Sequence, residues 1–220
     1  LWQEEKKKGK IRNPMDGIMV FHSTFPGIVN LNATRIVKRN PVDAYDVTAA
    51  DIEAREQMVE LHDFLKNRVP GFENSMILSS AVQTGVRESR MIDGEHLLTA
   101  EELVACTAFE DAIACGNYDI DIHNPEGSGT SHYFFPAGQY YTIPYRSLIP
   151  KNAENLLVVG RCISATHEAQ ASIRIMCIVC TLGEAAGTAV SVAVKDGTTT
   201  RNVDVGKLRR TLEQNGAVIQ

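Results

Sequence analysis

The sequence predicts an α/β fold that also contains an α+β part. Three observations favour it: short β-rich runs near the N-terminus, an amphipathic helical pattern over residues 48–68, and a continuous apolar run at 155–160 that precedes a long apolar helix. The chain has 220 residues, of which 44% are hydrophobic and 22% charged. This composition is typical of a folded globular protein.

The first half of the chain is expected to combine antiparallel strands with helices. Turn residues separate the first two β-rich runs, and Thr48 is a good N-cap for a helix that Pro70 and Gly71 stop. Thr99 is an N-cap for a second helix. We expect these elements in order: strands at 18–22 and 28–31, a helix at 48–68, strands at 75–81 and 85–92, and a helix from 99 to about 116.

The second half is expected to contain a buried strand and a long helix. The apolar run ending in Gly160 is typical of a strand buried on both faces of a parallel sheet, and Asp204 caps a short final helix. A preceding loop is long enough to suggest a functional segment. The expected elements are a loop at 123–138, strands at 139–143 and 155–160, a helix at 172–195 and a helix at 205–214.

Residues 175–194 require a membrane test because their only charge is Glu184 and their length is near that of a bilayer span. Gly, Thr and Ser residues dilute the hydrophobicity, so we interpret the segment as a buried helix. Gly183 and Gly187 have a spacing that lets a helix approach a strand or a cofactor closely.

The net charge and the cysteine content of the chain limit the kinds of partner and the compartment that we expect. A net charge of -5 argues against nucleic acid and anionic membranes, so we expect a small-molecule substrate, with a homo-oligomer left open. Five irregularly spaced cysteines do not match a secreted disulfide framework and favour the cytoplasm, although the compartment stays open. No leader is visible before the first structured segment. Cys177 and Cys180 could be a redox pair or half a metal site, but core packing is favoured for them and for the other cysteines.

Six ordered motifs lie along the chain: VPGFEN at 69–74, GVRESR at 85–90, DIDIH at 119–123, YTIPYRSLIP at 141–150, NLLVVGRCISATHEA at 155–169 and LGEAAGTA at 182–189. Together they resemble the bacterial FAD-dependent oxidoreductase family, and the resemblance extends over roughly residues 30–218.

The resemblance implies an FAD-binding doubly wound domain with an inserted β-rich substrate domain. The family's Gly-x-Gly-x-x-Gly fingerprint for the pyrophosphate is absent, so this chain is expected to be the C-terminal part of a longer protein whose N-terminal segment completes the FAD site. Residues 1–150 would form the substrate-side domain, with antiparallel strands and two helices. Residues 151–220 would supply the last strand and helices of the FAD-binding domain. Distant heterodisulfide-reductase-like relatives carry iron–sulfur clusters, but this chain has no such ligand set, and we expect no metal.

A helix N-terminus near residues 172–176 would offer unpaired N–H groups and partial positive charge to the electron-rich edge of a reduced flavin. Two departures from relatives are Glu184, where the family tends to have Gln, and Arg161, where the wider class often has an acidic residue; the second leaves ribityl recognition open. The expected cofactor-binding residues are Gly160, Arg161, Ser172, Arg174, Ile175, Met176 and Gly183. The alternative for Arg161 and Arg174 is a purely structural ion pair.

Candidate catalytic residues are chosen for proton transfer near the flavin. His167 lies in the predicted loop after the flavin strand and titrates in the useful range, although it could instead only anchor that loop. Tyr145 and His123 are further candidates. Arg87, Arg90 and Arg146 are candidate substrate clamps, with a structural ion pair to Glu88 or another acid as the alternative for Arg87 and Arg90.

The predicted function is hydride transfer between a small organic substrate and FAD, with this fragment inactive alone. The alternative is a non-catalytic binding or assembly module that keeps a flavoprotein-like fold.

Overall fold

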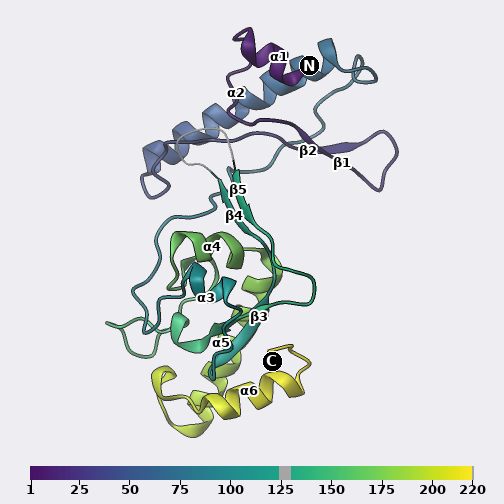
Figure 1. The fold of residues 1–220 in the computed structure, drawn as a ribbon. Coiled ribbons are helices and arrows are strands. Elements are labelled where there is room, and N and C mark those ends of the chain that lie inside the picture. The colour runs from purple at the N-terminus through teal and green to yellow at the C-terminus, as the bar shows by residue number, and fades with distance from the viewer. Residues whose placement is uncertain (124–129, 220) are drawn as a thin grey trace. The chain divides into compact units, whose positions relative to one another are not determined.

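The computed structural model describes residues 1–123 and 130–219, which form helices and small sheets (Figure 1). This mixture is consistent with the predicted α/β class. The helices are α1 (Trp2–Lys7), α2 (Ala44–Arg68), α3 (Ala100–Val104), α4 (His167–Ile173), α5 (Met176–Asp196) and α6 (Val205–Gln214). The strands are β1 (Met19–His22), β2 (Val29–Asn32), β3 (Ala112–Gly116), β4 (Ile120–His123), β5 (Thr130–Tyr133) and β6 (Tyr141–Pro144).

The chain divides into two compact units with separate cores. The first unit comprises Leu1–Val86 and His123–Thr130, and the second comprises Arg87–Ile122 and Ser131–Gln220. Each unit has its own cluster of buried apolar side chains. The predicted functional division at residue 150 concerns a cofactor part and a substrate part, and it stays a prediction.

In the first unit, the long helix begins earlier than the sequence predicts. Asp43 is its N-cap, and its carboxylate accepts hydrogen bonds from the backbone N–H groups of Tyr45 and Asp46. The prediction of Thr48 as N-cap was therefore wrong, because Asp43 already satisfies two free N–H groups of the first turn. The predicted C-terminus at Arg68 is confirmed.

The predicted antiparallel pair near the N-terminus is confirmed. β1 and β2 pair antiparallel, with Met19 opposite Asn32 and His22 opposite Val29. The core of this unit is formed by Trp2 and Phe64, which meet edge to face, together with Ile11, Ala33, Leu61 and Leu65.

The predicted strands at 75–81 and 85–92 are wrong, because both segments are irregular. Side chains of α2 bind part of this stretch instead of a neighbouring strand. The guanidinium of Arg55 donates to the backbone oxygens of Ala81 and Val82, and the carboxylate of Asp51 accepts from the N–H of Thr84. A segment whose backbone is bound by side chains has no need of a ladder partner.

In the second unit, α3 has the predicted start but ends early. Thr99 and Glu102 form a reciprocal capping box, which confirms the predicted N-cap. The helix ends at Val104, so its predicted extension to about residue 116 was wrong. Residues 112–116 instead form β3, which pairs antiparallel with β6 and has an irregular register between Ala112 and Ala114. The predicted strand at 139–143 corresponds to β6, which is shifted by about two residues.

The predicted buried strand at 155–160 is also wrong. These residues form no strand, Leu156 and Val159 are exposed, and the run ends in a 3-10 helix, Gly160–Cys162. A parallel strand needs neighbours to bond its N–H and C=O groups. In the part of the chain that the structure describes, the sheets have two strands each and none includes this segment.

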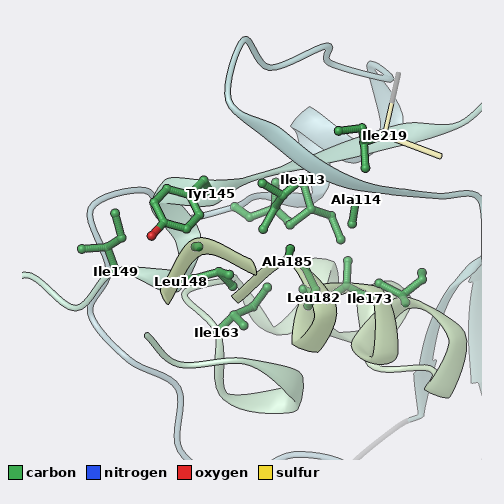
Figure 2. Packing of buried hydrophobic residues seen from close by; sticks show 14 of the residues in the cluster. Ile113, Ala114, Tyr145, Leu148, Ile149, Ile163, Ile173, Leu182, Ala185 and Ile219 are labelled. Atoms are coloured by element: carbon green, nitrogen blue, oxygen red, sulfur yellow. The ribbon is translucent and has the colours of Figure 1, made fainter. Parts of the chain in front are cut away.

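The predicted helix at 172–195 is two helices, α4 and α5, with a break at Arg174 and Ile175. The inner face of α5 packs into the core of the second unit: Figure 2 shows Leu182 and Ala185 on this helix facing Ile113 and Ala114 of β3. The short α6 starts and ends where the sequence predicts and has Asp204 as its N-cap.

Two further features bear on the predictions. Among the described residues, α5 is the one helix long and apolar enough to cross a membrane by length and composition, a property that core helices of folded domains share. The predicted loop at 123–138 contains β5, and its residues 124–129 lie outside the described part of the chain.

Candidate functional site

A charged cluster in the second unit is centred on Asp121 of β4. Its Oδ2 lies 3.5 Å from a guanidinium nitrogen of Arg87 and 3.6 Å from one of Arg174, while Oδ1 lies 3.7 Å from Nε2 of His132. His132 also contacts Asp119 through Nδ1, at 3.2 Å. The cluster therefore brings together Arg87 and Arg174, two of the predicted site arginines. Both bind the carboxylate of Asp121, a group of the protein itself.

The arginines of this cluster are held by the protein itself. Arg174 is the residue that separates α4 from α5, and its guanidinium also donates to the backbone oxygen of Asp121 at 3.1 Å. Burial and the positive charge of Arg87 lower the pKa of Arg174. For Arg87, the ion-pair alternative to a substrate clamp is supported, with Asp121 as the acid in place of Glu88.

His167 is the first residue of α4, not a loop residue, because Thr166 caps the helix there. Its Nδ1 lies 2.5 Å from Oε2 of Glu88, and 47% of its side chain is exposed. The pair combines a titratable imidazole with a carboxylate at the surface of the unit. Of the predicted catalytic residues whose side chains are described, Tyr145 and His167, His167 is the exposed one.

The other two predicted catalytic residues have different outcomes. Tyr145 is 1% exposed and its hydroxyl donates to the backbone oxygen of Thr200 at 2.6 Å. Burial raises the pKa of Tyr145 to about 12. Figure 2 shows its ring among the core side chains, which argues against a catalytic role. The side chain of His123 lies outside the described part of the structure.

Four of the predicted cofactor residues are at least partly exposed, although Ile175 also packs against the core of the second unit. The backbone of Gly160 has φ 81°, a left-handed conformation that favours glycine, and Arg161 is exposed beside it. The 3-10 helix that contains both contacts α5. Ile175 is the N-cap residue of α5 and provides no side-chain cap, and Met176 is 82% exposed. The first N–H groups of α5 are therefore free of a side-chain acceptor.

Two of the predicted cofactor residues, Ser172 and Arg174, have side chains that are bound within the protein. Ser172 is buried, and its hydroxyl donates to the oxygen of Tyr118 and pairs with the hydroxyl of Tyr141 at 2.7 Å. Arg174 is bound to Asp121. A Cβ at Gly183 or Gly187 would meet nothing within 4 Å, so no strand of the described chain approaches these glycines closely, and the space beside them is open.

The remaining predicted substrate residues are separate from the Asp121 cluster. Arg146 makes a two-point ion pair with Asp111, with Nε at 2.9 Å and an Nη nitrogen at 3.1 Å from the carboxylate oxygens. This contact raises the pKa of Arg146. Arg90 is exposed and makes no ion pair within residues 1–123 and 130–219. Of the three predicted substrate arginines, Arg90 is the one without an ion pair in these described ranges.

The prediction that the cysteines pack in the core was wrong for three of them. Cys162, Cys177 and Cys180 are exposed free thiols, whereas Cys106 and Cys115 are partly buried. Met176 and the two cysteines of α5 lie on the helix face opposite the core residues Ile178 and Leu182. In the described ranges, no group of three or more His, Cys, Asp or Glu side chains could hold a metal ion.

Sequence reasoning missed Asp121, His132 and Gln170. Asp119 and Asp121 are two residues apart in a β-rich run, so a strand places them on one face, and this alternation was the available signal. Gln170 gave no signal, because its partner is a backbone oxygen far away in the sequence. A cavity of about 670 Å³ in the first unit, beside Glu5, Arg12 and Phe64, contains none of the predicted residues.

Comparison with known proteins gives one match. A family model described as FAD dependent oxidoreductase matches residues 2–212. No curated protein and no solved structure matches the chain.

Proposed function

Because the chain belongs to the FAD dependent oxidoreductase family, we propose that it serves in hydride transfer between a small organic substrate and flavin. The match over residues 2–212 is the observation that carries this proposal, since it extends over nearly the whole chain. The cofactor is FAD, and when bound it accepts or donates the hydride.

The donor groups at the start of α5 fit such a cofactor. A helix N-terminus carries a partial positive charge and unpaired N–H groups, and α5 has no side-chain cap to occupy them. The exposed guanidinium of Arg161, in a 3-10 helix that contacts α5, adds a full positive charge. We propose that the N–H groups of Met176 and Cys177, together with Arg161, hold the electron-rich edge of the flavin.

The pyrophosphate of FAD needs another part of the protein. The sequence contains no Gly-x-Gly-x-x-Gly, the loop that commonly cradles this group. We propose that a segment outside Leu1–Gln220 supplies it and that this chain is inactive alone. The exposed Arg90 is the residue proposed to bind an acidic group of the substrate, and His167 the residue proposed to exchange a proton with it.

The test is flavin binding by the complete protein that contains this chain. Purified without added cofactor, that protein should be yellow with the absorption bands of bound FAD. Arg161→Ala should weaken FAD binding about tenfold, the effect of losing one charge-assisted contact. Arg210→Ala, which removes an exposed arginine from α6, is the matched control and should leave binding unchanged.

A colourless protein that ignores added FAD would contradict the proposal. It would favour a binding or assembly module, which a tight protein partner of the chain would then support.

A further inference from the structure

One turn of α4 holds the segment at residues 87–88 by two separate contacts. Nδ1 of His167 lies 2.5 Å from the carboxylate of Glu88. Three residues later, the side-chain amide of Gln170 donates to the backbone oxygen of Arg87 at 2.9 Å. Residues three apart in a helix lie on the same face, so both contacts reach the same segment. Gln170 is 1% exposed, which makes this anchor a buried one.

The double contact restricts where the carboxylate of Glu88 can lie. Because the backbone oxygen of Arg87 is fixed by Gln170, the next residue in the chain is held beside the first residue of α4. A carboxylate fixed in this way approaches the imidazole of His167 from one side, at Nδ1. It therefore acts on the orientation of the ring.

The hydrogen-bonding chemistry of the carboxylate and the imidazole determines which ring nitrogen of His167 carries the hydrogen. A carboxylate is only an acceptor, so the hydrogen bond requires Nδ1 of His167 to carry the hydrogen. In the neutral imidazole, Nε2 is then an acceptor with an available lone pair. Among the described residues, Nε2 of His167 forms no hydrogen bond or ion pair with a protein group, and 47% of the side chain is exposed. The proton-accepting atom is thus the ring nitrogen that has no hydrogen-bond partner in the described chain, on a side chain that is about half exposed.

No other charged group that the structure describes near His167 and Glu88 changes the assignment of the hydrogen to Nδ1 of His167. Arg174 interacts electrostatically with Glu88, but its ion pair is with Asp121. Arg87, the chain neighbour of Glu88, is also paired with Asp121. Glu168, the next residue of α4, is exposed and accepts no hydrogen bond from His167. Within the described chain, Glu88 is the acid that contacts the imidazole.

We infer that Glu88 is a positioning residue, which fixes His167 in the tautomer with hydrogen on Nδ1 and presents Nε2 to the substrate as a general base. The inference rests on the proposed function and deepens it. A proton passes from a substrate hydroxyl to Nε2, so an O–H bond breaks and an N–H bond forms. The carboxylate of Glu88 faces the resulting imidazolium across the Nδ1 hydrogen bond and stabilises its charge.

The first test reads the tautomer directly by ¹⁵N NMR of histidine-labelled protein, with His167→Gln to assign the signal. The neutral ring of His167 should carry its hydrogen on Nδ1. Glu88→Ala should move the hydrogen to Nε2, whereas Glu168→Gln, which neutralises the neighbouring exposed acid, should change nothing. An Nε2–H ring in the unmodified protein, or a tautomer that Glu88→Ala leaves unchanged, would overturn the inference.

The second test uses the complete flavin-loaded protein. Glu88→Gln should lower kcat for flavin reduction roughly ten- to a hundredfold with KM changed less than about twofold, and should alter the acid limb of the pH profile. Glu88→Asp, which keeps the carboxylate, should restore part of the rate. Equal rates for Glu88→Gln and the unmodified protein would overturn the positioning role.

The two tests separate this inference from the proposed function. Absence of flavin from the complete protein would defeat the proposed function, while the NMR result would still decide whether Glu88 sets the tautomer. Bound flavin together with an unchanged tautomer in Glu88→Ala would defeat the inference alone.

Discussion

At the scale of single residues, burial and partners decide which side chains can take part in chemistry. Tyr145 and His167 are both polar residues from family-like motifs. The hydroxyl of Tyr145 is bound to a buried backbone oxygen, whereas the imidazole of His167 is about half exposed. A buried hydroxyl that already has its acceptor cannot exchange protons with a ligand without breaking a core contact. The accessible imidazole is the better candidate.

Tyr145→Phe should therefore affect stability and not chemistry. The change leaves the oxygen of Thr200 without its donor, which should cost about 1–3 kcal/mol in the free energy of unfolding. FAD affinity of the complete protein should be unchanged. Urea unfolding checks the first expectation, with Tyr133→Phe, an exposed tyrosine, as the control. A large loss of flavin reduction without a loss of stability would restore Tyr145 as a catalytic candidate.

The five thiols should differ in reactivity in the same way. Burial raises the pKa of Cys115, and its Sγ lies 3.2 Å from the oxygen of Val218, so it should react slowly with a disulfide reagent. The exposed Cys162, Cys177 and Cys180 should react first. The release of thiolate product over time measures this order in Leu1–Gln220. A slow phase that persists in Cys115→Ser would show that another thiol is the protected one.

At the scale of elements, the sequence predicts features that depend on neighbouring residues better than features that depend on distant ones. Asp204 and the Thr99 capping box are satisfied within one helical turn, so the sequence predicts both helix starts. The two strands around the turn at 24–27 are equally local. The candidate site was predictable only in part. His167 lies in a recognisable motif, but its contact with Glu88 joins residues 79 positions apart and leaves no local sequence pattern.

Several elements that depend on distant partners were predicted incorrectly. Residues 112–116 are a strand because β6, far along the chain, pairs with them. Residues 155–160 have the composition of a buried strand, yet no strand of the described chain pairs with them. The break between α4 and α5 coincides with the contact of Arg174 with Asp121. In each case tertiary contacts outweighed local propensity.

The contact between β3 and α5 gives a prediction at this scale. A Cβ at Gly116 would lie 2.6 Å from Cδ1 of Ile178 and 2.8 Å from the hydroxyl of Tyr141. Gly116→Ala should therefore force a shift in packing and destabilise the second unit by roughly 1–3 kcal/mol. Gly187→Ala is the matched control: it has no neighbour within 4 Å, and alanine should stabilise α5 by up to about 1 kcal/mol.

Thermal unfolding followed by far-UV circular dichroism compares the two glycine variants. The midpoint should fall for Gly116→Ala and rise or stay for Gly187→Ala. Equal midpoints would mean that β3 and α5 do not pack as described.

At the scale of the whole molecule, the chain has two cores. The cluster around Trp2 and Phe64 lies wholly in the first unit, and the cluster around Leu182 and Tyr141 lies wholly in the second. Cooperative unfolding follows shared packing, so two separate cores predict two cooperative units. The proposed flavin site and the His167 pair both use residues of the second unit. Loss of the first unit alone should therefore leave the tautomer of His167 unchanged.

Acid should separate the two units, because the first contains a carboxylate with a strongly shifted pKa. Lys8, together with Arg68 and Lys10, lowers the pKa of Glu5 to about 2 from its usual 4.5, against the opposing effect of burial. A carboxyl group whose folded pKa is depressed adds stability above its unfolded pKa. That contribution is lost as pH falls from about 4.5 towards 2. The first unit should lose stability across this window.

Trp2 makes this loss measurable. It is the only tryptophan and is packed against Phe64 in the first core, so its fluorescence follows the first unit, whereas circular dichroism follows both. Between pH 4.5 and 2, the fluorescence midpoint in urea should fall below the main dichroism midpoint. Glu5→Gln should make the fluorescence midpoint lower at neutral pH and less dependent on pH. Glu56→Gln, which neutralises an exposed acid, should leave the fluorescence midpoint and its pH dependence unchanged. Coincident midpoints at every pH would mean that the two cores unfold as one cooperative unit.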